Sequence, residues 1–143
     1  MRRLLGLDVG DRRIGVALSD PLGLTAQRLT VLERRDLAAD LSAIDALVAE
    51  HQVERIVVGL PLTLQGSEGP QAKKVTLLVE ALRRKLAVPI ELIDERLTTV
   101  QGERVLRETG ASRSTRKGLI DQLAAQLILQ QFLDMHRPTG TGS

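Results

Sequence analysis

The sequence predicts an α/β fold built on one five-stranded mixed sheet, an antiparallel three-strand meander plus two parallel strands, with helices on both faces. Three observations support this. Short apolar runs alternate with turn residues in the first quarter of the chain. Residues 55–60 (RIVVGL) form a nearly continuous apolar run, typical of a central parallel strand. Elsewhere, apolar residues recur at helical spacing. The 143 residues fit a single domain, 1–136, followed by a flexible tail, 137–143.

The meander is expected from three apolar runs, at residues 4–9, 14–18 and 25–32. The break at 10–13 (GDRR) predicts a tight hairpin between the first two runs. The segment 19–23 (SDPLG) is a turn by composition.

The rest of the chain is expected to alternate helices with strands. Asp36 should cap a first helix that ends near residue 51. Its inward face should carry Leu37, Leu41, Ile44, Leu47 and Val48. The later elements expected are strand 55–60, loop 61–70, helix 71–86, strand 89–93, helix 98–107, basic loop 110–118 and helix 119–135.

Composition excludes several classes of protein. The chain has no cysteine, which rules out disulfides and thiolate metal sites, and its two histidines lie in polar contexts. It has one Phe and neither Trp nor Tyr, which disfavours binding of single strands by aromatic stacking. No run of 18 apolar residues occurs and the start lacks a signal pattern, so we expect a cytoplasmic protein without a membrane partner. A pI near 9.5 with a net charge of +2 mildly favours nucleic acid as partner.

Acidic residues stand at three points where a metal site is expected. Asp8 interrupts an apolar strand, where a carboxylate is costly unless a cation or hydrogen bonds compensate it. The alternative is an Asp that hydrogen-bonds the hairpin backbone. Asp94 and Glu95 follow the fifth strand directly, and the residues themselves do not separate the two. If the first and fifth strands are parallel, these acids emerge at one edge of the sheet.

The third point is Asp121, in the first turn of the last helix. An acid there could simply offset the helix dipole. Its angular position, however, is shared with Ala125, Ile128 and Phe132, which favours a side chain directed at the sheet. On this interpretation the glutamines at 122, 126 and 130 mark the side that faces water.

Converging carboxylates without His or Cys are typical of a site for Mg²⁺ or Mn²⁺, with one or two ions. Such a site can activate water against a phosphodiester. Basic residues are expected around the same edge as nucleic-acid contacts: Arg12, Arg13, Arg96, Arg113, Arg116 and Lys117.

Four segments carry a resemblance to a known family. They are LGLDVGDRRIGVALSD (5–20), VVGLPLTLQGSEG (57–69), IDERLTT (93–99) and KGLIDQLAAQLIL (117–129). Together they resemble the YqgF/RuvX family of RNase H-like nucleases over nearly the whole chain. The resemblance implies an RNase H-like fold, Mg²⁺ or Mn²⁺, and a catalytic and metal-binding trio at Asp8, Glu95 and Asp121.

The resemblance also implies a function, an endonuclease that matures the 5′ end of precursor 16S rRNA. The first alternative is a Holliday junction resolvase acting on branched DNA, which would need two sites and hence a homodimer. A non-catalytic nucleic-acid-binding factor is a second, and a sugar-kinase or actin-like ATPase a third, disfavoured because 143 residues supply one domain only. Thr63 and Gln65 stand where the family usually has Asn and Asp, which puts substrate contacts from that loop in question.

Overall fold

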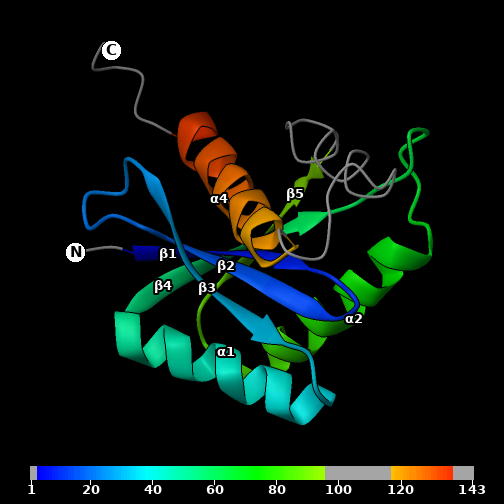
Figure 1. The fold of residues 1–143 in the computed structure, drawn as a ribbon, viewed down its shortest axis with the longest axis horizontal. Helices are drawn as coiled ribbons and strands as arrows, with labels where there is room; N and C mark the ends of the chain where they lie inside the picture. The colour runs from blue at the N-terminus through cyan, green and yellow to red at the C-terminus, as the bar shows by residue number, and fades with distance from the viewer. Residues whose placement is uncertain (1–2, 96–116, 137–143) are drawn as a thin grey trace.

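The computed structural model describes residues 3–95 and 117–136, with side chains of the last helix from residue 123 onward (Figure 1). Five strands form one sheet in the order β3-β2-β1-β4-β5. Their bounds are β1 Arg3–Val9, β2 Arg13–Ser19, β3 Ala26–Glu33, β4 Val53–Leu60 and β5 Ile90–Asp94. The antiparallel pairs are β1 with β2 and β2 with β3, and the parallel pairs are β1 with β4 and β4 with β5. The predicted mixed sheet is confirmed.

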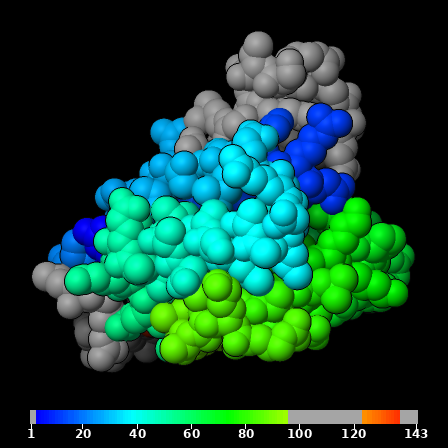
Figure 2. All heavy atoms as spheres, turned by 90° about the horizontal axis from the view of Figure 1, so that it is seen from below, coloured from blue at the N-terminus to red at the C-terminus, as the bar shows by residue number. Residues whose placement is uncertain are grey.

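Helices cover both faces of the sheet. Helices α1 (Leu37–His51) and α2 (Pro70–Lys85) pack on one face, where apolar side chains from β1, β2 and β4 meet those of the two helices. Seen from that side, the helices form a continuous surface (Figure 2). Helix α4 (Lys117–Met135) crosses the opposite face alone among the described helices. The alternation of β1 sorts its residues between these two layers, so Leu5, Leu7 and Val9 join the first core.

The hairpin and the first helix form where the sequence predicts them. Gly10 N–H donates to the Arg13 carbonyl at 2.8 Å, which closes the turn between β1 and β2. Asp36 caps α1 by accepting the Ala39 N–H at 2.8 Å. Strand and helix ends agree with expectation to within two residues, including α4, which begins at Lys117 rather than at 119.

Two side-chain predictions are wrong. Leu37, expected in the core, is half exposed, while Asp40, which no apolar pattern marks, is buried. Of the three glutamines expected to face water, Gln126 and Gln130 bond to the backbone of a neighbouring strand, and the side chain of Gln122 lies outside the described set. Gln130 Oε1 accepts the Ala26 N–H at 2.8 Å, and Gln126 Nε2 donates to the Ala26 carbonyl at 3.0 Å. These side chains form hydrogen bonds with backbone groups of an edge strand. The spacing of polar residues along a helix does not predict such bonds.

The expected helix 98–107 and the basic loop before Lys117 lie outside the described residues. Within residues 3–95 and 117–136, no helix is long and apolar enough to cross a membrane.

Candidate active site

Asp8 lies on the central strand, with its side chain on the face that α4 covers. It is only 2% exposed. In the antiparallel pair it lies opposite Gly15, and its neighbour on the same face, Gly6, lies opposite Ala17. An alanine Cβ at Gly6 would come within 2.7 Å of the Leu129 Cβ of α4, which identifies the face. A buried carboxylate in the middle of a sheet thus points into the layer between sheet and helix.

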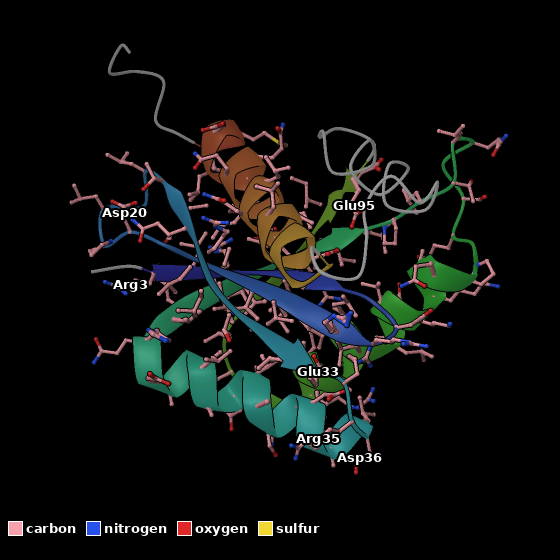
Figure 3. The ribbon with its side chains drawn as sticks, in the orientation of Figure 1. Arg3, Asp20, Glu33, Arg35, Asp36 and Glu95 are labelled. Carbon is pink, nitrogen blue, oxygen red and sulfur yellow. The ribbon has the colours of Figure 1, made fainter. Side chains whose placement is uncertain are left out.

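Glu95 reaches the same layer from the end of β5. Its side chain is fully buried. A Cβ built on Gly59 would lie 2.6 Å from Glu95 Oε2, so the carboxylate lies directly over that glycine. Leu7 pairs with Val58 in the parallel pair of β1 and β4, so the next residues, Asp8 and Gly59, lie side by side on neighbouring strands. Since such strands are about 4.8 Å apart, the Glu95 carboxylate lies over the strand next to Asp8. Figure 3 shows Glu95 at this end of the sheet.

Asp94 is directed differently. Its neighbour Ile93 packs in the core beneath α4, so the alternation of β5 turns Asp94 toward the other face. The geometry therefore separates two adjacent acids that the residues alone did not, and brings Glu95, not Asp94, to the Asp8 side of the sheet.

Small residues surround Asp8 on its face of the sheet. The nearest positions are Gly6, Gly15 and Gly59, and Ala17 and Val57 lie beside Gly6 on the two neighbouring strands. At Gly59 even a methyl group would meet Ile128 Cδ1 at 2.5 Å as well as Glu95. The glycines let the helix and the Glu95 side chain come close to the sheet. An apolar strand pattern alone does not explain why glycine stands at these positions.

Asp121 belongs to α4, one helical turn before Ala125. The Ala125 carbonyl lies 3.1 Å from the Cβ position of Gly6. The other end of the helix is held near the start of β3, where Gln130 Nε2 donates to the Leu24 carbonyl at 3.2 Å. The helix therefore runs from the end of the sheet that carries Asp8 toward the opposite end (Figure 1). The backbone of Asp121 lies about 6 Å nearer the Asp8 end than Ala125.

The described residues thus bring two of the three predicted ligands to one edge and one face. The side chain of Asp121 is outside the described set. Within that set, no three His, Cys, Asp or Glu side chains form a group that could hold a metal ion.

The predicted basic residues divide in the same way. Arg12 is exposed and Arg13 half-buried on the hairpin that follows Asp8. Arg96, Arg113 and Arg116 lie outside the described residues. Lys117 is the first residue of α4, and its side chain is not described.

The loop between β4 and α2 is organised by its own side chains. Thr63 Oγ1 and Ser67 Oγ lie 2.8 Å apart, and the Gly66 N–H donates to the Thr63 carbonyl at 2.8 Å. Gly66 has a positive φ of 87°, which favours glycine. Thr63 therefore shapes the loop, and Gln65 is exposed at its tip.

Three further polar residues lie at this edge although the sequence patterns did not predict them there. Gln71 Nε2 donates to the Val9 carbonyl at 3.3 Å, and Lys74 Nζ lies 3.1 Å from Asp11 Oδ1. Arg34 bonds to the Gly10 carbonyl at 2.8 Å. Each is an ordinary polar residue in its local sequence, and only its long-range partner gives it a position at the edge of the site.

Comparison with known proteins agrees with this architecture. The family model RuvX, described as Holliday junction resolvase, matches residues 2–135. A protein of Myxococcus xanthus named "Putative pre-16S rRNA nuclease" is 50% identical over 139 residues, covering 97% of this chain and 92% of its own. One of Moorella thermoacetica with the same name is 54% identical over 132 residues, covering 92% of this chain and 94% of its own.

Solved structures share the fold at low identity. RuvC of T. thermophilus in complex with a Holliday junction substrate superposes with a TM-score of 0.59 at 17% identity, covering 94% of this chain and 96% of that one. The fowlpox virus Holliday junction resolvase gives a TM-score of 0.52 at 8% identity, covering 93% of this chain and 99% of that one. The expected RNase H-like fold is thereby confirmed. With a family model matched over nearly its whole length and curated relatives at about half identity, the chain belongs to the RuvX family of nucleases.

Proposed function

We propose that this protein is a divalent-metal-dependent endonuclease that hydrolyses phosphodiester bonds in structured nucleic acid, and that its reaction is 5′-end maturation of precursor 16S rRNA. The observation that carries the proposal is the placement of Glu95. Its carboxylate lies over Gly59, on the strand beside the buried Asp8, so two acids that are 87 positions apart in the sequence meet on one face.

The residues present fit a hard cation. Asp8 and Glu95 are both buried, and two neighbouring buried carboxylates are costly unless cations or hydrogen bonds compensate them. The sheet positions next to Asp8 on its face are Gly6, Gly15 and Gly59, so no side chain of the sheet stands between Asp8 and the Glu95 carboxylate over Gly59. Mg²⁺ or Mn²⁺ bound there, as one or two ions, would activate water and stabilise charge on the phosphodiester oxygens. Asp121, one turn before Ala125, is the proposed third ligand.

Substrate class is supported by charge and by the relatives. Arg12 and Arg13 lie on the hairpin that follows Asp8, where they can contact phosphates. The basic residues Arg96, Arg113, Arg116 and Lys117 are proposed to extend this contact. The named function of the curated relatives, at about 50% identity over almost their full length, favours precursor rRNA.

The central test is Asp8→Asn, with Asp11→Asn as its control. Asp11 is an exposed acid three residues away, so its substitution removes a charge of the same sign without touching either of the two buried carboxylates. Asp8→Asn is expected to lower the cleavage rate of precursor 16S rRNA by about 10²- to 10³-fold or more, with little loss of Tm. Asp11→Asn should cleave at close to the wild-type rate. Full activity of Asp8→Asn would remove Asp8 from the mechanism.

A second test concerns the contacts between basic residues and the phosphates of the substrate. Neutralising Arg113, Arg116 and Lys117 together should weaken binding and reduce the slope of log affinity against log salt by about 2, since each single-strand phosphate contact contributes about 0.7. Neutralising Arg84 and Lys85, exposed at the end of α2, is the control and should leave the slope unchanged. An unchanged slope in the triple variant would place the phosphate contacts elsewhere.

Junction resolution is the second candidate, favoured by the description of the matching family model. A resolvase must present two active sites to a two-fold symmetric junction, so it requires a homodimer. Cleavage of a four-way DNA junction, single-stranded RNA and precursor 16S rRNA, compared side by side in Mg²⁺ and in Mn²⁺, separates the candidates. Symmetric cuts in the junction by a dimer, without rRNA cleavage, would establish the resolvase instead.

A further inference from the structure

The hairpin that follows Asp8 is held by a partly buried ion pair between Arg34 and Asp40, which lie beyond the third strand of the meander. Arg34 lies just after β3. Its Nε donates to Asp40 Oδ2 at 2.9 Å, and its Nη1 donates to the Gly10 carbonyl at 2.8 Å. Its backbone N–H donates to the Arg12 carbonyl at 2.8 Å. One residue therefore holds the hairpin by both its side chain and its backbone.

Asp40 orients this arginine. It is only 4% exposed, and its second carboxylate oxygen accepts the Arg35 N–H at 2.9 Å. Both of its oxygens are thus used, and the planar guanidinium is fixed in one direction. The arrangement explains why a charged residue occupies the inward face of α1, where Leu37 was expected.

The two peptide carbonyls after Asp8 are each held by a side chain. Gln71 of α2 donates to the Val9 carbonyl, and Arg34 donates to the Gly10 carbonyl. Gly10 is itself confined, because a Cβ there would lie 3.1 Å from the Arg13 carbonyl. The backbone on the C-terminal side of Asp8 is therefore fixed by Gln71 of α2 and by Arg34, which Asp40 of α1 orients, while the Asp8 side chain points into the other layer.

We propose that Arg34, oriented by Asp40, is a positioning residue that fixes the backbone following Asp8 and so aligns its carboxylate for metal binding. This rests on the proposed function, since it assigns Asp8 to the metal site. The expected cost of losing such support is about 10- to 100-fold in metal affinity or activity. An arginine is required because only its fork reaches both Asp40 and the Gly10 carbonyl.

The experiment compares Arg34→Ala, Arg34→Lys and Asp40→Asn with a matched control, Arg35→Ala. Arg35 is the exposed neighbour, and its side chain takes no part in the bonds described above. Three quantities are measured: Mn²⁺ affinity by calorimetry, the single-turnover rate at saturating substrate, and amide hydrogen exchange at Gly10.

We expect Arg34→Ala to weaken Mn²⁺ binding by about 10- to 100-fold, to lower the single-turnover rate by a similar factor, and to speed exchange at Gly10. Arg34→Lys should show most of the loss of Mn²⁺ affinity seen in Arg34→Ala, although it keeps the positive charge and should still fold. Asp40→Asn should lie between, and Arg35→Ala should match the wild type.

Faster exchange at Gly10 with unchanged Mn²⁺ affinity in Arg34→Lys would overturn the proposal and leave a purely structural ion pair. If the wild type cleaves, equal Mn²⁺ affinities and equal cleavage rates in Arg34→Ala and Arg35→Ala would also overturn it. If the wild type binds Mn²⁺ but cleaves no substrate, the proposed function fails, and the role of Arg34 is still decided by the affinities. A wild type that binds no Mn²⁺ would refute both.

Discussion

Gly59 offers a direct way to disturb the Glu95 carboxylate without touching an acid. In Gly59→Ala the new methyl group would lie 2.6 Å from Glu95 Oε2 and 2.5 Å from Ile128 Cδ1. Ordinary contacts between such atoms are about 3.5–4.0 Å, so each partner must move by roughly 1 Å. Both side chains are fully buried, which leaves little room for the movement.

Two effects of different size follow from this crowding. Overpacking a core position by one methyl group costs about 1–3 kcal/mol, or a fall in Tm of about 2–12 °C for a domain of this size. Since domains have a free energy of unfolding of about 5–15 kcal/mol, the variant stays folded at 25 °C. A catalytic group displaced by about 1 Å can cost about 10²-fold in rate. The predicted loss of cleavage is therefore far larger than unfolding can explain.

The assay measures Tm and the single-turnover cleavage rate for Gly59→Ala, Ile128→Val and the double variant. Ile128→Val deletes Cδ1, the atom nearest the new methyl group, and leaves Glu95 untouched. The double variant should regain Tm relative to Gly59→Ala while its cleavage rate stays low. Cleavage at the wild-type rate by Gly59→Ala would show that activity does not depend on the place of the Glu95 carboxylate over position 59. Joint recovery of Tm and rate in the double variant would attribute the loss to packing alone.

Three further predictions concern stability. Gly6→Ala sets a methyl group 2.7 Å from the Leu129 Cβ, which is tied to the backbone, so α4 must shift and urea unfolding should show a loss of about 1–3 kcal/mol or more. Gln130→Ala leaves the Ala26 N–H without its acceptor and should cost about 1 kcal/mol in the same measurement. The Thr25 N–H, ahead of other backbone donors, lowers the pKa of Asp20, so the carboxylate stabilises the fold above about pH 4 and loses this effect as pH falls through its depressed value. The Tm difference between wild type and Asp20→Asn should accordingly be present near neutral pH and vanish in acid, and a difference that persists below that range would contradict the assignment.

Much of the fold can be predicted from short-range patterns in the sequence. The apolar runs, the GDRR break and the Asp36 cap predict the meander, the hairpin and the start of α1, because strand alternation, turn chemistry and capping act between residues close in the chain. The same holds for the carboxylate in β1, since an acid inside an apolar strand is recognisable without any partner. Short-range rules also predict that Asp8 shares a face with Gly6, which the register of β1 confirms.

Other features depend on contacts between distant segments. Whether Asp94 or Glu95 joins Asp8 is decided by which face of β5 packs beneath α4 and by the absence of a side chain at Gly59. The burial of Asp40 is decided by Arg34, and the bonding of Gln130 by an edge strand 104 residues earlier in the sequence. Periodicity assigned Leu37 to the core and the glutamines to solvent because it records only the average polarity of a face.

Residue types and near neighbours in the chain were enough to predict the α/β class and the order of the described strands and helices, because alternation, turn chemistry and capping act over short distances. Packing between distant segments had to be seen to learn which acids share a face, which glycines lie beneath them and which arginine holds the hairpin. A buried polar group bonds to whatever atom the folded chain brings within about 3 Å, and that atom has no fixed distance along the sequence.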